Sequence, residues 1–551
     1  MLFQVIYLLV CSVLILNASK VEWKKEIDQR PNIVVIMADD LGSYDISLKG
    51  SNQILTPNID ALGYQGVIFK RHYTESLCTP SRAAFLTGKS SIHIGLQSSV
   101  ILSGEPRGLP IDVKILPEYL KEIGYRTHIV GKWHLGMAKK DFIPTHRGFD
   151  SHTGHLGEFI DYFDFTRMTE SYTRGFDFRC NESVYRDRVG QYATEVLTDE
   201  AMKIIRNHDT TSHPLFLYLA QAAVHAGNSD KPLQALARDV DKINHIRDPR
   251  RRLYAAMVKA LDRSVGKIVQ ALDFKGILEN TIILFFSDNG GPTEGFHSTG
   301  ASNFPLRGQK DGPWEGGLLG TAVIWSPFLQ KRHYVSNQVI HITDWLPTFL
   351  ETAGFTWSSR GSINALDGHS IWPTLTSSRP LRDREIVHNI DTIEGYTSYY
   401  THGWKYINGT MWEGKHDSWL GNMPYETSPE AHQYENIVMN SITWRVLNPF
   451  ARMHLQPNNV KSLRSRTAFH CQKKLWFSRE CKPREAPCLF NVYTDPCEVN
   501  NVAHLLPDYL NLIQRRLQYL QENMVPPSNV PGDPNADPAL NDGLWTWWLE
   551  S

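Results

Sequence analysis

The sequence predicts an α/β fold, in which a large domain with a mainly parallel sheet flanked by helices precedes a smaller α+β domain with an antiparallel sheet. The first observation is a set of apolar runs, rich in β-branched residues, that are typical of strands buried on both faces. These runs occupy residues 31–38, 124–130, 214–220 and 281–286. The second observation is that helix-like stretches separate the runs, as crossovers between parallel strands require. The stretches occupy residues 116–123, 191–207 and 253–274.

The third observation is a change of sequence character beyond Pro380, where short aromatic segments alternate with turns. Such segments favour an antiparallel sheet. They occupy residues 398–400, 404–407 and 489–493. Between them, residues 411–466 are polar and irregular, and we assign no element there. Residues 341–350 predict a buried helix that packs on the sheet of the large domain.

The C-terminal part of the chain begins with a predicted amphipathic helix at residues 507–522, for which Pro507 suits the first turn. Its apolar stripe consists of Leu510, Ile513, Leu517 and Leu520. A tail rich in Pro and Asp follows and ends with Trp545, Trp547 and Trp548. Two interpretations of these tryptophans stay open: they stack on sugar rings, or they pack against the main body.

Length and composition set the domain organisation. A chain of 551 residues has room for two or three average domains, or for one large and one small domain. We divide it into a signal peptide at 1–19, the large domain at 30–378, the smaller domain at 379–502, and the C-terminal helix and tail at 503–551. The 57 basic and 58 acidic residues give a net charge of -1, which provides no global argument for a nucleic-acid partner or an acidic membrane surface.

The N-terminus is an apolar run that ends near Asn17 and precedes the small residues Ala18 and Ser19. This pattern predicts a secretory signal peptide cleaved near those residues, although the run lacks a preceding Lys or Arg. An uncleaved anchor is the alternative. No later segment is long and apolar enough for a stable membrane span.

Secretion makes the remaining cysteines interpretable as disulfide partners. Apart from Cys11 and Cys78, the chain contains Cys180, Cys471, Cys481, Cys488 and Cys497. The last four crowd into one stretch, but their pairing cannot be deduced from the sequence. Because the number is odd, at least one thiol is free, pairs between chains, or pairs with Cys78. Asn181 and Asn408 begin glycosylation motifs, which support secretion weakly.

Polar side chains follow the predicted strands of the large domain at the point where each strand ends. In open α/β sheets, ligands bind beyond these carboxyl ends. The residues are Asp39, Asp40, Lys132, His134, His225, Asp288 and Asn289. The carboxylates and the amide are oxygen ligands of the kind that hard cations prefer, so we expect a Ca²⁺ site, with Mg²⁺ as the less favoured ion.

Residues 77–88 predict a short helix with a reactive group at its start. Thr79 is the expected N-cap, Pro80 the first helical residue and Gly88 the C-terminal stop. The start of a helix favours an anion because unpaired N–H groups and the positive end of the dipole lie there. Cys78 precedes the expected cap and Arg82 lies in the first turns. A lone cysteine in this position is more often a buried structural residue.

The segments 78–82 (Cys-Thr-Pro-Ser-Arg) and 86–88 (Leu-Thr-Gly) together resemble the signature of the sulfatase family. The stretch 124–134, which ends Gly-Lys-Trp-His, looks like that family's second signature, and the acidic pairs look like its metal motifs. His225 and Lys310 fall in the expected order. The resemblance extends from about residue 31 to 375, and more loosely to about 502. It is greatest to the arylsulfatase B group and implies an alkaline phosphatase/sulfatase-like catalytic domain.

The resemblance also implies roles for the residues. Cys78 is expected to be oxidised to formylglycine by the formylglycine-generating enzyme of the endoplasmic reticulum, and its hydrate to attack sulfur. Arg82 is expected to hold that hydrate, and Lys132 and Lys310 to bind the sulfate oxygens. The roles of proton transfer fall to His225 at the leaving group, His134 in the elimination step and Asp288 at the attacking hydroxyl. The metal ligands implied are Asp39, Asp40, the modified Cys78, Asp288 and Asn289.

The expected function is therefore a secreted or lysosomal sulfatase. Its expected substrates are sulfated sugars or glycosaminoglycans of the N-acetylgalactosamine sulfate type, with aryl sulfates, sulfated plant metabolites and steroids as further options. Two alternatives differ in class. One is a related phosphatase or phosphonate hydrolase, for which a Ser or Thr nucleophile and more metal ligands would be expected. The other is an inactive extracellular binding protein on a sulfatase scaffold.

Overall fold

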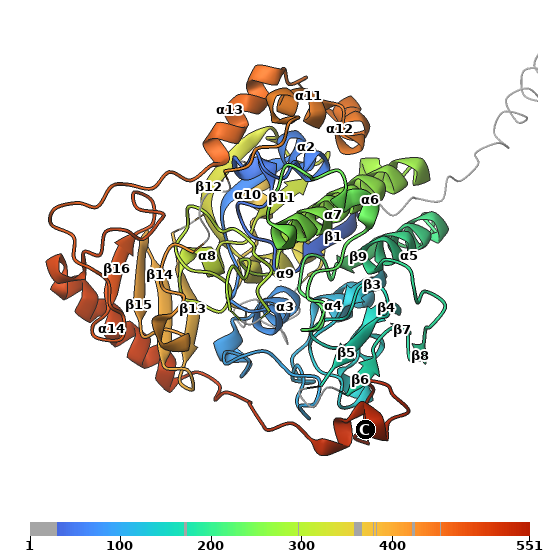
Figure 1. Cartoon of the computed structure of the whole chain (residues 1–551), viewed down its shortest axis with the longest axis horizontal. Coiled ribbons are helices and arrows are strands. Elements are labelled where there is room, and N and C mark those ends of the chain that lie inside the picture. The colour runs from blue at the N-terminus through green and yellow to red at the C-terminus, as the bar shows by residue number, and fades with distance from the viewer. Residues whose placement is uncertain are drawn as a thin grey trace, which may run out of the picture.

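A ten-stranded sheet forms the centre of the large unit (Figure 1). Its strand order is β12-β2-β11-β10-β1-β9-β3-β4-β7-β8. The strands are β1 (Asn32–Ala38), β2 (Val67–Tyr73), β3 (Arg126–Lys132), β4 (Ser151–His155), β7 (Arg179–Cys180), β8 (Ser183–Val184), β9 (Leu215–Ala220), β10 (Thr281–Ser287), β11 (Ala322–Trp325) and β12 (Tyr334–His341). The computed structural model describes residues 30–169, 173–295, 297–356, 366–377, 379–381, 383–420, 425–451 and 453–550.

The sheet is mainly parallel, which confirms the predicted fold class. Strands β10, β1, β9, β3 and β4 are neighbours in this order and all pair in parallel. Antiparallel pairing is confined to the flanks, where β11 joins β10 to β2 and where β7 and β8 extend the other edge. The four predicted strands are the adjacent members β1, β3, β9 and β10, so their carboxyl ends meet at one edge.

Helices cover both faces of this sheet, because the side chains of a buried strand alternate between two hydrophobic cores. Val34 and Ile36 of β1 belong to the core formed with α2, α5 and α7, whereas Ile33 and Val35 belong to the core formed with α3, α4 and α9. The helices of the large unit are α2 (Pro57–Gln65), α3 (Cys78–Thr87), α4 (Leu116–Glu122), α5 (Ala193–Asn207), α6 (Ala237–Val240), α7 (Pro249–Lys275), α8 (Glu315–Leu318), α9 (Trp345–Thr352) and α10 (Trp372–Ser377).

One predicted helix of this unit is partly wrong. The helix expected at 341–350 begins only at Trp345, because His341 still pairs with Tyr73 as the last residue of β12. A short 3-10 turn, Ile342–Asp344, then connects the strand to α9, and the Asp344 side chain accepts a hydrogen bond from the His341 backbone. Tertiary pairing with β2 therefore extends the strand into a sequence with helical character.

A four-stranded antiparallel sheet lies beside the large unit, as the aromatic segments predict (Figure 1). Its strands in spatial order are β13 (Glu385–Asp391), β14 (Tyr396–Thr401), β15 (Trp404–Asn408) and β16 (Cys488–Asn491). The amphipathic helix α14 (Pro507–Glu522) has the predicted bounds. Its buried residues Ile513, Leu517 and Leu520 pack against aromatic and aliphatic side chains of this sheet. A small two-stranded sheet, formed by β5 (Thr166–Met168) and β6 (Arg174–Phe176), lies between β4 and β7 in the sequence.

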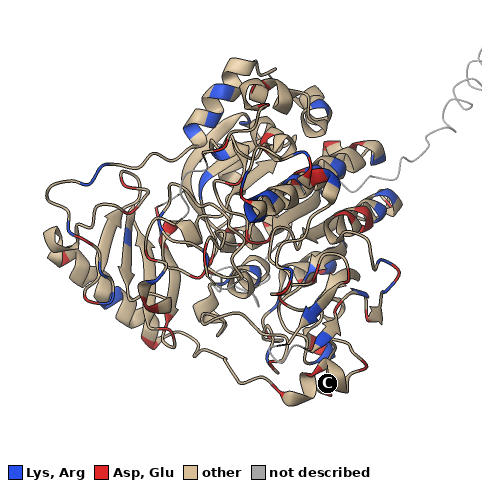
Figure 2. Cartoon of the chain, in the orientation of Figure 1, with Lys and Arg blue, Asp and Glu red and all other residues tan. Residues whose placement is uncertain are grey.

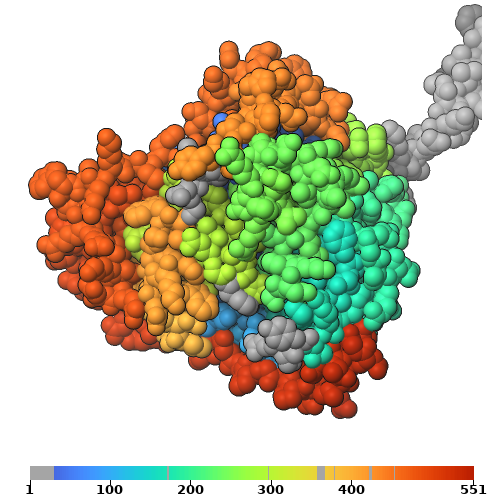
Figure 3. All heavy atoms as spheres, viewed as in Figure 1, coloured from blue at the N-terminus to red at the C-terminus, as the bar shows by residue number. Residues whose placement is uncertain are grey.

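The region between β15 and β16 leaves the smaller sheet and returns to it. It forms the short helices α11 (Tyr434–Met439), α12 (Ile442–Leu447) and α13 (Pro457–Thr467). Helix α12 contacts α2 and α7, α11 contacts α2, and α13 packs against α11 and β12. In Figure 3 these helices (orange) cover one side of the large unit, away from the smaller sheet. The Tyr434 hydroxyl donates to the buried Asp60 carboxylate at 2.6 Å, and Trp444 enters the large core. The predicted boundaries at 378 and 502 remain predictions.

Two disulfides crosslink the C-terminal part of the chain, and its tail packs against the large unit. Cys471 pairs with Cys497 and Cys481 with Cys488, whereas Cys78 and Cys180 are free thiols. Trp545 is buried and its indole N–H donates to the Arg167 carbonyl, so the tail packs against the main body as one of the two interpretations predicts. The predicted signal peptide at 1–19, with Cys11, lies outside the described residues.

Charges of both signs are interspersed along the ribbon (Figure 2), in keeping with the net charge of -1. The described residues include no helix with the length and apolarity that a membrane span requires.

Candidate active site

The polar residues that follow the central strands lie together at one edge of the sheet. Asp39 and Asp40 follow β1 directly, and the Asp39 backbone is held by hydrogen bonds with Ala223 and Val224 in the loop after β9. The backbone N–H of Asp288, after β10, donates to the Ala38 carbonyl of β1. Asp40 has a positive φ of 60°, a conformation that non-glycine residues adopt at an energetic cost.

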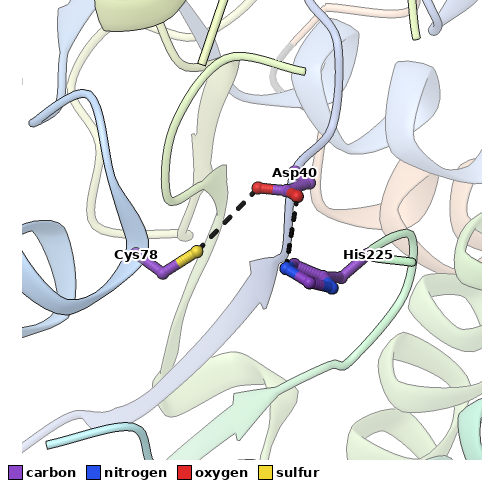
Figure 4. Close-up of side chains that lie close together, drawn as sticks. All are labelled: Asp40, Cys78 and His225. Atoms are coloured by element: carbon purple, nitrogen blue, oxygen red, sulfur yellow. Dashed lines mark hydrogen bonds and ion pairs between the residues drawn. The ribbon is translucent and has the colours of Figure 1, made fainter. Parts of the chain in front are cut away.

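Helix α3 brings Cys78 to the same edge. The Cys78 sulfur lies 3.5 Å from Asp39 Oδ1, 3.9 Å from Asp40 Oδ1 and 3.4 Å from Lys310 Nζ. Figure 4 shows Asp40 between Cys78 on one side and His225 on the other. His225 Nε2 is 3.5 Å from Asp40 Oδ2. Segments far apart in the sequence therefore converge on one buried point.

The start of α3 differs from the prediction. Cys78 is the first helical residue and Leu77 occupies the N-cap position, so Thr79 is not the cap. The Thr79 hydroxyl instead donates to the His134 carbonyl and accepts from the Ile101 backbone, each at 3.1 Å. The predicted stop at Gly88 is confirmed, with φ of 65° and a hydrogen bond to the Ala84 carbonyl.

Three basic side chains pair with three carboxylates in the cluster, so the paired charges balance. Arg82 lies 2.8 Å from Asp288 Oδ2 and 3.5 Å from Asp39 Oδ1. Lys132 Nζ is 2.7 Å from Asp39 Oδ2, and Lys310 Nζ is 2.7 Å from Asp40 Oδ1. Lys310 keeps 13% of its side chain exposed, whereas the three carboxylates are fully buried.

Burial and the neighbouring charges shift the pKa values of the acids in opposite directions. Burial would raise the pKa of Asp39, but Lys132, His225 and Arg82 together hold it well below the usual range. For Asp288, burial and the Asp39 charge outweigh Arg82 and raise the pKa to about 7. Asp39 therefore carries a full negative charge at neutral pH, and Asp288 is the carboxylate suited to exchange a proton.

The Cys78 side chain is a poor nucleophile as an unmodified thiol. Burial raises the pKa of Cys78 far above its usual value, although Lys132 and Lys310 act in the other direction. Because the thiolate is the reactive form of cysteine, this environment suppresses ordinary thiol chemistry. The position at the centre of the charged cluster therefore suits a group other than a thiol.

The oxygen donors of the cluster fit a hard divalent cation. One ligand atom from each of Asp39, Asp40, Cys78 and Asp288 lies within 4.8 Å of the others. Asn289 adds an amide whose nitrogen donates to Asp40 Oδ1 at 2.7 Å. The amide oxygen, Asn289 Oδ1, is buried with no hydrogen-bond partner among the described residues. An orphaned buried oxygen beside three carboxylates is what a Ca²⁺ or Mg²⁺ site requires.

Two histidines present one ring nitrogen to the site because the other nitrogen is occupied. His225 Nδ1 lies 2.6 Å from the Ala226 carbonyl, so this nitrogen carries the proton and Nε2 faces Asp40. His134 Nε2 donates to the Ile101 carbonyl at 3.1 Å, and Nδ1 is buried without a partner in the described chain. Burial lowers the pKa of both rings, that of His225 to about 4, so both are neutral at pH 7.

The structure thus brings together every site residue that the sequence predicts. They are Asp39, Asp40, Cys78, Arg82, Lys132, His134, His225, Asp288, Asn289 and Lys310.

Sequence reasoning missed three aromatic or imidazole side chains beside these residues. Phe159 stacks on His225 with ring centroids 5.6 Å apart, and His297 lies 5.7 Å from His225. His155 ends β4 as the register partner of Lys132, and both of its ring nitrogens are buried without a partner in the described part of the chain. The loop at 290–303 is the only sequence signal for His297, and β4 is too short to be recognised from its pattern.

This chain is similar in sequence to known proteins. A family model described as "Sulfatase" matches residues 31–355. The chain is 36% identical to arylsulfatase J of Mus musculus over 526 residues, covering 95% of this chain and 81% of that protein. It is 32% identical to N-acetylgalactosamine-6-sulfatase of Homo sapiens over 417 residues, covering 70% of this chain and 73% of that protein.

Solved structures show the same architecture. The structure of Ps i-CgsB in complex with k-i-k-neocarrahexaose has a TM-score of 0.68 and 26% identity to this chain, covering 91% of it and 94% of Ps i-CgsB. The structure of BT4656 in complex with D-glucosamine-2-N,6-O-disulfate has a TM-score of 0.56, covers 91% of this chain and all (100%) of that chain, and supports the fold at 18% identity.

Proposed function

Because this chain belongs to the sulfatase family of sulfuric ester hydrolases, we propose that it hydrolyses sulfate esters of saccharides at the cluster centred on Cys78. The observation that carries the proposal is the convergence of a buried thiol, three carboxylates and three cations at the carboxyl edge of one sheet. Its curated relatives include N-acetylgalactosamine-6-sulfatase, which supports an N-acetylgalactosamine sulfate or a related glycosaminoglycan as substrate. Aryl and plant sulfates are the other members of the substrate class.

The residues that would hold the metal are Asp39, Asp40, Asp288 and Asn289, whose oxygen donors suit a hard divalent cation, and we propose Ca²⁺ with Mg²⁺ as the less favoured ion. When bound, the cation supplies positive charge that stabilises the sulfate oxygens as charge develops on them. The orphaned Asn289 oxygen supports this assignment.

We further propose that Cys78 is converted to formylglycine by a formylglycine-generating enzyme during maturation. The position of Cys78 between the carboxylates of Asp39 and Asp40 and the Lys310 ammonium group supports this proposal. When formed and hydrated, this group supplies the hydroxyl that attacks sulfur. Arg82, which pairs with Asp288 and Asp39, would orient this hydroxyl.

The side chains around Cys78 bind the sulfate group and accept the proton of the attacking hydroxyl. Lys132 and Lys310 bind the sulfate oxygens, since both ammonium groups already lie in the cluster and Lys310 contacts the Cys78 sulfur. Asp288, whose pKa is near neutrality, accepts the proton of the attacking hydroxyl.

Proton transfer at the other steps involves the two histidines. Lys310, whose ammonium group lies beside Asp40, supplies the proton that the departing oxygen takes up, and the neutral His225 ring relays it through Nε2. The unpartnered Nδ1 of His134 accepts a proton when sulfate leaves.

The disulfides and the predicted signal peptide support maturation in the secretory pathway, with a secreted or lysosomal destination. Neither alternative class gains support. The residue that begins α3 is a cysteine rather than the Ser or Thr of a phosphatase, and the site retains each predicted charged residue rather than losing any, as an inactive scaffold would.

The test is a turnover screen of the purified secreted protein against sulfated sugars, glucosinolates and an aryl sulfate. In parallel, mass spectrometry of the Cys78 peptide measures conversion to the aldehyde. We expect turnover of at least one ester class, a converted fraction at Cys78, and loss of turnover in Cys78→Ala. Full turnover in Cys78→Ala would contradict the mechanism, and no turnover by fully converted protein would contradict the function.

A further inference from the structure

An exposed tryptophan lies beside the active site in a strained loop. Trp412 keeps 52% of its surface exposed. It has a φ of 50°, and the next residue, Glu413, has a φ of 56°. Non-glycine residues with positive φ are costly and cluster at ligand sites, so the loop holds this ring in place against a conformational preference.

The indole is tied to the residue that follows Lys310. Trp412 Nε1 donates to Asp311 Oδ2 at 2.6 Å, and the Asp311 backbone N–H donates to the Ser76 carbonyl at 2.9 Å, two residues before Cys78. Asp311 also has a positive φ of 69°. One side-chain hydrogen bond therefore separates the ring from the chain segment whose lysine contacts the Cys78 sulfur at 3.4 Å.

Further contacts hold the loop. Trp314 Nε1 donates to Asp417 Oδ1 at 2.7 Å, and the Gly308 backbone N–H donates to the Ser418 carbonyl at 2.9 Å. The Arg484 side chain donates to the Glu413 carbonyl at 3.4 Å. An exposed aromatic ring on so firmly held a loop is pre-organised, and it loses little conformational entropy when a ligand stacks on it.

Two further acids lie close enough to Asp311 to shift its pKa. Burial raises the pKa of Asp311 to about 6, the Trp412 hydrogen bond and Lys310 oppose this shift, and the charges of Glu394 and Asp391 add to it. Both of these acids lie at the turn between β13 and β14, which therefore faces Asp311. Asp311 Oδ1 accepts no hydrogen bond within the described chain and is available to a ligand hydroxyl.

We propose that Trp412 and Asp311 form a saccharide subsite that binds an uncharged sugar ring attached to the sulfated residue. The Trp412 ring supplies a flat surface for the apolar face of the sugar, and Asp311 Oδ1 accepts a hydrogen bond from a hydroxyl of the same ring. A uronic acid or a second sulfate in this position is disfavoured by Asp311 and Glu394. This inference rests on the proposed function and narrows its substrate class.

The experiment compares three substrates at pH 7.5, above the pKa of Asp311. They are 4-nitrophenyl sulfate, a sulfated N-acetylgalactosamine disaccharide with a neutral hexose, and the same disaccharide with a uronic acid. We expect the wild type to prefer the neutral disaccharide over the acidic one by about tenfold in kcat/KM. Trp412→Ala should raise KM for the neutral disaccharide about tenfold with kcat retained, and leave kcat/KM for 4-nitrophenyl sulfate within about twofold.

Two further variants separate stacking from charge. Asp311→Asn keeps an acceptor for the indole but removes the charge, so it should reduce the preference for the neutral disaccharide to about twofold. Trp476→Ala, which removes a tryptophan that is 93% exposed, is the matched control and should change no parameter. The proposed subsite is overturned if Trp412→Ala lowers kcat/KM equally for all three substrates, or if it leaves kcat/KM for the disaccharides unchanged.

Failure of the proposed function gives a different result. If the wild type hydrolyses none of the three esters, the subsite is tested by calorimetry with the unsulfated neutral disaccharide. Affinity about tenfold weaker in Trp412→Ala than in the wild type supports the subsite, and equal affinity overturns it.

Discussion

Among the clusters of buried charge in the described chain, two differ in how many of their buried polar atoms lack a hydrogen-bond partner. The second cluster, which we call the joint cluster, consists of Lys405, Glu315, Glu498 and Tyr73. Lys405 Nζ lies 2.9 Å from Glu315 Oε1 and 2.8 Å from Glu498 Oε1, and the second oxygen is held by this ion pair without a hydrogen bond from the described residues. The Tyr73 hydroxyl donates to the other oxygen of Glu315, and the Glu315 backbone donates to the other oxygen of Glu498, each at 2.9 Å.

In the active-site cluster, by contrast, several buried polar atoms make no hydrogen bond to any described residue. Asn289 Oδ1, His134 Nδ1 and Arg82 Nε are buried without partners in the described chain, and Asp40 and His134 adopt positive φ. Unsatisfied buried groups and backbone strain both lower stability, so their concentration here indicates a site arranged for a ligand. The joint cluster connects β15 of the smaller sheet to α8, close to the segment that contains Lys310, and acts as a structural connection.

The largest expected difference between the clusters is in catalysis. Lys132→Met keeps the volume of a buried side chain but removes the cation beside Asp39 and the proposed contact to sulfate. We expect kcat/KM to fall by about 10³-fold, because a pre-organised charge in a buried site stabilises developing negative charge strongly. Steady-state kinetics on a sulfate ester measure the effect. Retention of more than a tenth of the activity would contradict the role given to Lys132.

The corresponding change in the joint cluster should affect folding instead. Lys405→Met leaves Glu315 and Glu498 buried without their cation, and removing one partner of a buried pair costs about 3–5 kcal/mol. Chemical denaturation measures the loss, while kcat of the folded fraction should stay within about twofold. The double variant Lys405→Met/Glu498→Gln should recover part of the stability. A fall in kcat as large as that of Lys132→Met would remove the distinction between the clusters.

The joint cluster should also make stability depend on pH. Burial raises the pKa of Glu498 to about 7, and Glu315 adds to this shift while Lys405 opposes it. Folding therefore favours the protonated form of Glu498. The resulting contribution of Glu498 to the free energy of unfolding is complete below pH 4.5 and is lost as pH rises through 7. We expect the wild type to lose about 1–3 kcal/mol of unfolding free energy across this range, and Glu498→Gln to lose less.

Denaturation at several pH values between 4.5 and 8 provides the measurement. Glu485→Gln, at an exposed glutamate, is the control and should keep the wild-type slope. Equal slopes in the wild type and Glu498→Gln would show that Glu498 does not titrate as its burial indicates.

The active-site cluster was more predictable from the sequence than the joint cluster, for a topological reason. Parallel neighbouring strands place their carboxyl ends at one edge, so the residues after β1, β9 and β10 must meet once the strands are recognised. Glu315, Lys405 and Glu498 come from elements whose mutual packing no local pattern encodes. His155 and Trp412 were missed for the same reason, because a short strand and an irregular loop give no periodic signal.

At Thr79, tertiary hydrogen bonds replace the helix-capping role that the local sequence predicts. Its hydroxyl, predicted to cap α3, bonds instead to His134 and Ile101, and the Ile101 carbonyl holds His134 Nε2. Thr79→Val keeps the shape but removes both hydrogen bonds. We expect unfolding free energy to fall by about 1–3 kcal/mol and kcat to fall about five- to tenfold, because His134 loses part of the support that orients its ring.

Thr87→Val is the matched control at the other end of the same helix, where the hydroxyl donates to the Ala83 carbonyl and accepts from the Lys89 backbone N–H. It should lower stability by about 1 kcal/mol without changing kcat. A simple N-cap would behave in the same way, since loss of a cap costs about 1 kcal/mol of stability and leaves a distant ring in place. If Thr79→Val lowers stability but leaves kcat unchanged, Thr79 acts only as a helix cap, as the sequence predicts. In that case the Thr79 hydroxyl does not position His134.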